Sequence, residues 1–122
     1  MSRDYRKLVA FQLADSLAVR LYRATAAFPA EERFGLRAQI RRAAVSAATN
    51  IVEGTARRSL SEYLNFLNIA TGSAAETRYL IDLAERLDFI TEEAAVDLGS
   101  DYERLVAHLL ALTRSLGALD RH

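Results

Sequence analysis

The chain has 122 residues, 51% of them hydrophobic, and its 16 basic residues balance its 16 acidic residues. This length and composition fit one domain with its own core, and the absence of cysteine excludes disulfides and thiolate chemistry. A single proline and five glycines favour long helices. Without a run of about 18 apolar residues, or an apolar segment after the charged residues 1–7, neither a membrane-spanning helix nor a secretory signal is predicted.

The first predicted helix runs from about residue 8 to residue 27. Its apolar side chains recur at intervals of three and four residues, which places them on one stripe. The stripe consists of Phe11, Ala14, Leu17, Ala18, Leu21, Thr25 and Phe28. Pro29 is expected to end the helix, because a proline disfavours the helical conformation of the residue before it.

The second predicted helix runs from about residue 32 to residue 53. Its apolar stripe is rich in alanine, so a neighbouring helix can approach it closely. The stripe consists of Leu36, Ile40, Ala43, Ala47 and Ile51. Glu31 and Glu32 suit the positive end of the helix dipole, and Gly54 is expected to cap the other end.

The third predicted helix runs from about residue 60 to residue 87 and begins with a capping box, Ser59 to Glu62. Its apolar residues cover two sides about 100° apart, whereas one stripe of about that width is enough inside a monomeric bundle. The second side consists of Ile69, Leu80, Leu83 and Leu87. The surplus predicts packing against another subunit, and Gly72 predicts a close backbone contact.

The fourth predicted helix runs from about residue 92 to residue 117, with Thr91 as its N-cap. Its apolar residues alternate at intervals of three and four, which is a heptad seam. They are Ala95, Leu98, Tyr102, Leu105, Leu109, Leu112 and Leu116. Gly117 is expected to end the helix and residues 118–122 to fray. Short links predict a single all-α domain over residues 1–122, an antiparallel up-down-up-down four-helix bundle.

Charge is distributed unevenly along the chain. Residues 33–58 contain six arginines and one acid, Glu53, whereas residues 76–104 contain nine acids and three arginines. Such an asymmetry can steer anionic partners towards the basic segment. It can equally make the helices or subunits of the protein attract one another.

The second helix also carries a polar ladder beside its apolar stripe, formed by Arg42, Ser46, Asn50 and Glu53. One interpretation is a buried network that fixes the register of the helices. The other is a site for a ligand or partner. Arg37 and Arg41 are expected nearer the outside, as solvated side chains or as phosphate contacts.

The residues that carry catalytic or metal chemistry are scarce. The only histidines are His108 and His122, and no Glu-x-x-His pair of the di-iron bundles is present. There is no glycine-rich phosphate loop or dinucleotide fingerprint. No serine lies in a nucleophile elbow. The sequence therefore predicts no metal, no cofactor and no enzymatic activity.

Several short motifs occur in a specific combination. They are Phe28-Pro29, Glu32-Arg33-Phe34-Gly35-Leu36, residues 39–46 (QIRRAAVS), residues 50–54 (NIVEG), Ser61-Glu62-Tyr63 and Gly72-Ser73. Together they resemble the signature of the four-helix-bundle proteins encoded in intervening sequences of bacterial large-subunit ribosomal RNA genes. That family includes the accessory variability determinant protein of diversity-generating retroelements. The likeness covers roughly residues 8–116.

The resemblance implies a bacterial, cytoplasmic bundle that assembles as a homopentamer. Its retroelement relative is a basic pentameric barrel that binds nucleic acid and a reverse transcriptase, whereas this chain is neutral overall. The first hypothesis is a homo-oligomeric scaffold that binds RNA or a ribonucleoprotein partner through its basic arginines. These are Arg33, Arg37, Arg41, Arg57 and Arg58. The second is a protein-only interaction module with no nucleic-acid role and no membrane association.

Overall fold

Four helices account for most of residues 3–119, the part of the chain that the computed structural model describes. They are α1 (Val9–Thr25), α2 (Leu36–Thr55), α3 (Leu60–Arg86) and α4 (Glu92–Leu119). Two short 3₁₀ helices, η1 (Tyr5–Lys7) and η2 (Ala30–Glu32), precede α1 and α2. No strand occurs in this part of the chain, so the all-α prediction is confirmed.

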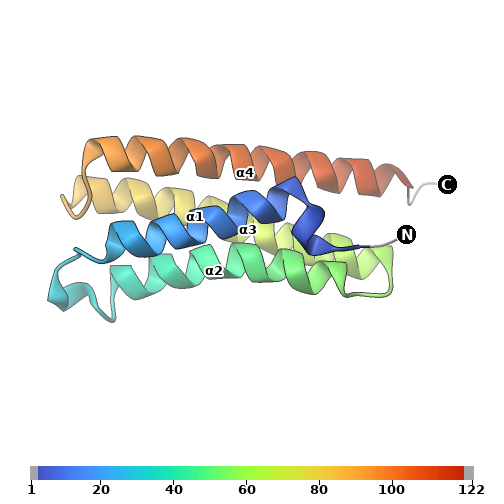
Figure 1. Ribbon diagram of the computed structural model, residues 1–122, viewed down its shortest axis with the longest axis horizontal. Coiled ribbons are helices and arrows are strands. Elements are labelled where there is room, and N and C mark those ends of the chain that lie inside the picture. The colour runs from blue at the N-terminus through green and yellow to red at the C-terminus, as the bar shows by residue number, and fades with distance from the viewer. Residues whose placement is uncertain (1–2, 120–122) are drawn as a thin grey trace.

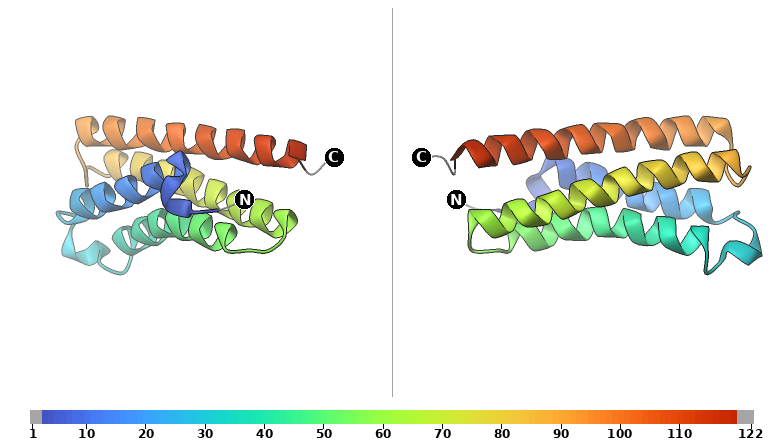
Figure 2. Two further views of the ribbon diagram at one scale, coloured as in Figure 1. Left: turned by 45° about the vertical axis from the view of Figure 1, so that its right-hand side comes forward. Right: turned by 180° about the vertical axis from the view of Figure 1, so that it is seen from behind.

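Each helix runs antiparallel to the next, and the four pack in a ring in which α1 and α3 both contact α2 and α4 (Figures 1 and 2). The predicted up-down-up-down bundle is confirmed. One end of the bundle holds the start of α1, the α2–α3 link and the end of α4. The opposite end holds the α1–α2 and α3–α4 links (Figure 1). None of the helices in residues 3–119 is long and apolar enough to cross a membrane.

The core consists of the predicted stripes. All five stripe residues of α2 are buried, and the heptad seam of α4 is buried from Ala95 to Leu109. Alanines on α2 and α3, among them Ala47, Ala70 and Ala74, are also fully buried, which lets these two helices approach closely. Part of the second side of α3 lies inside the chain, because Leu80 is buried as well.

The start of α2 differs from the prediction. The helix begins at Leu36, four residues later than expected, after η2 and a turn. A carboxylate oxygen of Glu32 accepts a hydrogen bond from the backbone N–H of Leu36 at 2.8 Å. Glu32 therefore satisfies a backbone group at the start of α2 from outside the helix.

The predicted cap at Gly54 is wrong. Gly54 lies inside α2 and is buried, since the helix continues to Thr55. A Cβ atom at this position would lie 3.0 Å from Cδ1 of Tyr63 and 3.1 Å from Cβ of Phe66. The glycine is needed because α3 crosses here too closely for a side chain.

The starts of α3 and α4 confirm two predicted caps. The hydroxyl of Ser59 accepts a hydrogen bond from the backbone N–H of Glu62 at 3.0 Å, and Thr91 does the same for Ala94 at 3.1 Å. The predicted end of α4 is wrong, because the helix passes through Gly117 to Leu119. Residues 120–122 of the expected frayed tail lie outside the described residues.

The close contact predicted at Gly72 does not occur within the described chain. Gly72 is exposed, and a Cβ atom there would meet nothing within 4 Å. Its neighbour Ser73 is the residue that touches another helix, through a hydroxyl contact of 2.8 Å with Ser46 on α2.

Candidate functional site

The two ends of the bundle carry opposite charge. At the end with the start of α1, the described residues 3–7 and 57–62 contain five cations and two acids. This basic end consists of Arg3, Arg6, Lys7, Arg57 and Arg58, with Asp4 and Glu62. At the opposite, acidic end, residues 30–37 and 85–93 contain six acids and three arginines. The polarity therefore runs along the bundle axis rather than following the order of the chain.

This arrangement divides the five arginines predicted as one contact set. Arg33 and Arg37 lie at the acidic end, and Arg57 and Arg58 lie at the basic end. The 20 residues of α2 separate the two groups by about 30 Å. The five residues therefore do not form one continuous basic face.

Arg41 holds α2 against α1. Its Nε donates to Oγ1 of Thr25 at 2.8 Å and its Nη2 to the carbonyl oxygen of Tyr22 at 2.9 Å. The guanidinium also lies 4.4 Å from the centre of the Tyr22 ring, within cation–π range. Arg41 is half-buried, and two of its donors serve the packing of these two helices.

The basic end is built from segments far apart in the sequence. Nη1 of Arg3 donates to the carbonyl oxygen of Arg57 at 2.8 Å, and its guanidinium lies 4.8 Å from the ring centre of Tyr63. The guanidinium of Arg57 in turn lies 4.5 Å from the ring centre of Phe66. Stacking on aromatic rings holds both guanidinium planes in place while leaving donors for other partners.

The acids of the basic end are already engaged. Asp4 accepts from the backbone N–H of Arg6 at 3.1 Å and pairs with its Nε at 3.0 Å. The hydrogen bond from the Arg6 side chain lowers the pKa of the Asp4 carboxyl. Glu62 accepts from the hydroxyl of Ser59. Among the described residues, four cations of this end form no ion pair. They are Arg3, Lys7, Arg57 and Arg58.

The sequence did not single out Arg3 and Lys7 as candidate contacts. Both lie in the charged segment before α1, and Lys7 is some 50 residues from Arg57 in the chain, beyond the reach of local patterns. Only the antiparallel packing of α1 and α2 brings this segment next to the α2–α3 link. Short links between helices predict antiparallel neighbours, and that topology predicts that Arg3 and Lys7 lie near the α2–α3 link.

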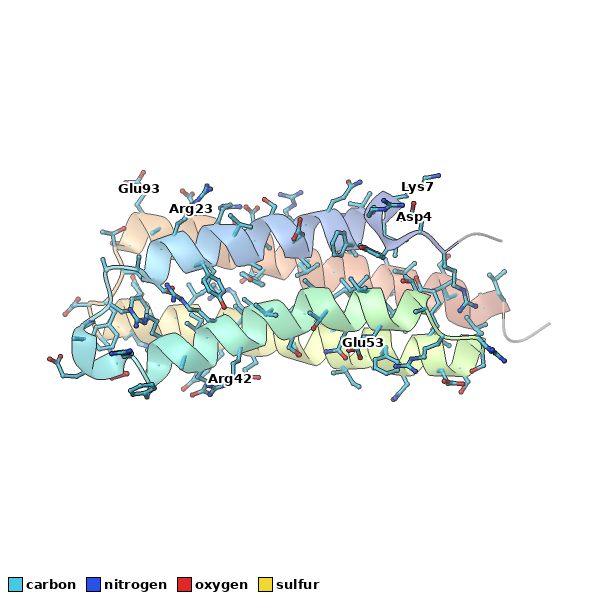
Figure 3. All side chains as sticks on the ribbon, turned by 60° about the horizontal axis from the view of Figure 1, so that its bottom comes forward. Asp4, Lys7, Arg23, Arg42, Glu53 and Glu93 are labelled. Carbon is cyan, nitrogen blue, oxygen red and sulfur yellow. The ribbon has the colours of Figure 1, made fainter. Side chains whose placement is uncertain are left out.

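The polar ladder of α2 is only partly a network. Nδ2 of Asn50 donates to the carbonyl oxygen of Ser46 at 2.8 Å and lies 3.0 Å from its hydroxyl, which contacts Ser73 on α3. Arg42 and Glu53 are exposed on the surface of α2 (Figure 3). The prediction of a buried network is therefore wrong for Arg42 and Glu53. Ser46 links α2 to α3, and Asn50 donates to Ser46 within α2.

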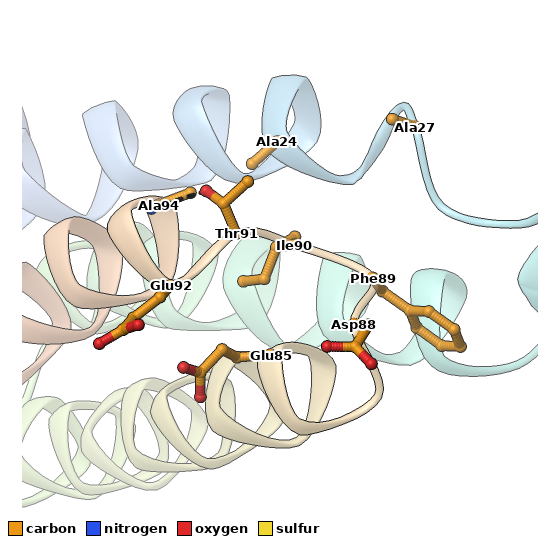
Figure 4. A pocket seen from close by; sticks show the side chains of 9 residues that line it. All are labelled: Ala24, Ala27, Glu85, Asp88, Phe89, Ile90, Thr91, Glu92 and Ala94. Carbon is orange, nitrogen blue, oxygen red and sulfur yellow. Dashed lines mark hydrogen bonds between the residues drawn. The ribbon is translucent and has the colours of Figure 1, made fainter.

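A cavity of about 590 Å³ lies at the acidic end between α1 and the α3–α4 link (Figure 4). Its lining includes Phe89, Ile90 and the carboxylates of Glu85, Asp88 and Glu92. Within residues 3–119 no group of three histidine, cysteine or acidic side chains is placed to hold a metal ion. The cavity contains no histidine or cysteine, and the hydroxyl of Thr91 is used to cap α4.

Comparison with known proteins places the chain in a family. Residues 6–111 match the family described as 23S rRNA-intervening sequence protein. A solved structure of a protein with unknown function, from the S23 ribosomal protein family of Bacteroides thetaiotaomicron, is 28% identical and superimposes with a TM-score of 0.78. The likeness covers 86% of this chain and 98% of that one. A search of curated proteins found no match. The chain belongs to the family of 23S rRNA-intervening sequence proteins.

Proposed function

We propose that this protein is a non-enzymatic scaffold that assembles as a homopentamer and binds RNA, alone or in a ribonucleoprotein, through its basic end. One observation carries the proposal: Arg3, Lys7, Arg57 and Arg58 converge on one end without acidic partners among the described residues. Unpaired guanidinium and ammonium groups are the donors that phosphate oxygens require. The family description, which names 23S rRNA, supports the choice of RNA.

Assembly into a ring should raise the RNA affinity of the basic end. In a closed ring every subunit presents the same surface in the same orientation to the symmetry axis. A pentamer therefore repeats the basic end five times on one side or around one rim. Repetition raises the effective concentration of contacts, so that an RNA held by one subunit binds the next more readily.

The outer side of α3 supports assembly. Ile69, Tyr79 and Leu87 are all more than two-fifths exposed, and the exposed Gly72 lies between Ile69 and Tyr79 on the same stripe. A large side chain on each side of a glycine leaves room for another helix to approach closely. We infer that this stripe packs against a second copy.

RNA binding is tested by comparing two matched double variants. Arg57→Gln with Arg58→Gln removes two charges from the basic end, and Arg33→Gln with Arg37→Gln removes two from the acidic end. Fluorescence anisotropy with a labelled RNA hairpin, titrated across salt concentrations, measures both affinity and its salt slope. The first variant is expected to lower the slope of log affinity against log salt by about 1.4–1.8, and the second to leave it unchanged. Equal effects of the two variants, or no binding by the wild-type protein at low salt, would refute the proposal.

A protein-only module is the second candidate, and the opposite charge of the two ends favours it. Complementary ends attract each other between molecules, and salt screens that attraction. Light scattering at several salt concentrations separates the two functions. Assembly that disappears with salt, together with no RNA binding, would support the protein-only module.

A further inference from the structure

An apolar slot opens at the basic end because the helices differ in length. Helix α4 has 28 residues and α1 has 17, so the last turns of α4 extend beyond the start of α1. Leu112 and Leu116 continue the heptad seam there, but both are only partly buried. Where α1 would cover them, the chain instead bends through η1 (Figure 1).

The slot has a volume of about 390 Å³. This leucine slot is lined by Leu8, Leu60, Tyr63, Leu112, Leu116 and Leu119, with Arg3, Asp4 and Lys7. Its volume lies in the range of small-molecule sites, which are mostly apolar with a few polar groups that orient the ligand. The larger cavity at the acidic end lacks this character, because three carboxylates line it.

The charged residues of the slot favour an anion. Asp4 is neutralised by its ion pair with Arg6 at 3.0 Å. Arg3 and Lys7 have no carboxylate partner among the described residues. The slot therefore combines an apolar interior with a positively charged lining, which is the pattern that an anionic amphiphile requires.

We propose that the leucine slot binds a medium-chain fatty acid, with its alkyl chain against the leucines and its carboxylate between Arg3 and Lys7. The slot shares Arg3 and Lys7 with the proposed RNA surface, but fatty-acid binding is measured without RNA, so its test does not depend on the proposed function.

Titration of the full-length protein with a dansylated undecanoic acid, followed by displacement with octanoate, decanoate and dodecanoate, tests the site. Saturable probe binding is expected, and affinity should rise by about fourfold per methylene until the slot is filled. Decanol, which lacks the charge, should bind about tenfold more weakly than decanoate. No saturable binding, or equal affinity for decanoate and decanol, would overturn the proposal.

Matched variants locate the site. Leu116→Ser removes a lining side chain, and Leu110→Ser removes an exposed leucine from α4 that lies outside the slot. The first is expected to weaken decanoate binding about tenfold and the second to leave it unchanged. Equal effects would overturn the assignment. Circular dichroism melting shows whether each variant is folded.

A surface variant keeps the test decisive if Leu116→Ser unfolds. Arg3→Gln combined with Lys7→Gln should weaken decanoate binding about tenfold and leave decanol binding unchanged.

Light scattering and vesicle sedimentation show whether the slot has another occupant. If Leu116→Ser dissociates an oligomer whose slot never bound the probe, a second copy occupies the slot. Sedimentation with phosphatidylglycerol vesicles but no binding of free decanoate would point to a lipid surface instead, and either result contradicts the proposal.

Discussion

At the scale of single residues, Tyr102 is the clearest departure from a well-satisfied core. The side chain is fully buried, and its hydroxyl has no hydrogen-bond partner in the described part of the chain. A buried polar group without a partner costs about 1–3 kcal/mol. Tyr102→Phe is therefore expected to raise the free energy of unfolding by about 1 kcal/mol, as measured by urea denaturation.

Tyr102→Phe should also change how the stability of the protein depends on pH. Burial raises the pKa of Tyr102 above its usual range, because the phenolate would be desolvated. Because the phenol ionises more readily in the unfolded chain, the free energy of unfolding is unaffected by this group below the unfolded pKa of about 10 and falls as the pH rises from there towards the folded value. The wild-type protein should lose more stability than Tyr102→Phe between about pH 8 and pH 11. A destabilised phenylalanine variant at neutral pH would show that the hydroxyl has a partner.

The pKa of Asp101 is shifted in the opposite direction to that of Tyr102, because it is lowered. Nη1 of Arg20 on α1 donates to its Oδ2 at 2.7 Å, and Nη1 of Arg104 donates to its Oδ1 at 2.9 Å. The hydrogen bond from Arg20 is the main reason that the pKa of Asp101 is lowered. A lowered folded pKa stabilises the protein above the unfolded pKa, and this contribution is lost as the pH falls through the folded value.

Asp101→Asn is accordingly expected to lower the free energy of unfolding by at most about 1 kcal/mol at neutral pH, because solvent screens the partly exposed guanidinium of Arg20. The difference from wild type should vanish in acid, below the folded pKa. Glu103→Gln is the control, since its ion pair with Arg78 at 3.1 Å is more exposed and should contribute less. Urea denaturation across acidic and neutral pH measures both variants, and an equal loss in the two would contradict the prediction.

At the scale of elements, two glycines in helices have opposite surroundings. Gly54→Ala forces a Cβ atom to within 3.0 Å of Tyr63 and should destabilise the protein by about 1–3 kcal/mol. Gly72→Ala places its Cβ in open space within the chain and should gain about 0.5–1 kcal/mol from helix propensity in the dissociated protein. In the inferred assembly the same Cβ lies at the contact with the second copy and should weaken association. Thermal denaturation at a low and a high protein concentration separates the two effects, because assembly couples to unfolding. Stabilisation by Gly54→Ala would show that α2 and α3 can separate without cost.

Helical periodicity predicted the existence of all four helices and nearly all of the core, because the bundle requires each stripe to face its neighbours. Helix ends were harder to predict. Helix α3 ends at Arg86, and Asp88, which follows the C-cap Leu87, adopts a positive φ of 61° in the position usually taken by glycine. Gly54 and Gly117 resemble caps, yet both lie inside helices. Whether a glycine serves as a cap or as a crossing point depends on contacts with another helix, which local patterns do not contain.

At the scale of the whole molecule, the candidate site was the part least accessible from the sequence. Charge patterning identified Arg57 and Arg58 but grouped them with Arg33 and Arg37, which the length of α2 places at the other end. The basic end joins Arg3 to Arg57, separated by 54 positions in the chain. Such a surface follows from topology, so it becomes predictable only once the antiparallel order of the helices is known.

The proposed assembly is also a property of the whole molecule, and it predicts an effect of one charge placed on α3. Ile69 is 43% exposed on the outer stripe of α3, whereas Val96 is 61% exposed on α4. If the stripe of α3 is buried between subunits, Ile69→Arg buries an unpaired charge at every interface of the ring, which costs several kcal/mol. Val96→Arg adds the same charge to a surface that stays in water.

Light scattering should therefore report an oligomer for the wild-type protein and for Val96→Arg, and a monomer for Ile69→Arg. RNA affinity should fall with dissociation, because a monomer offers one basic end instead of five. A monomeric wild-type protein, or dissociation by Val96→Arg alone, would remove the basis for assembly through α3.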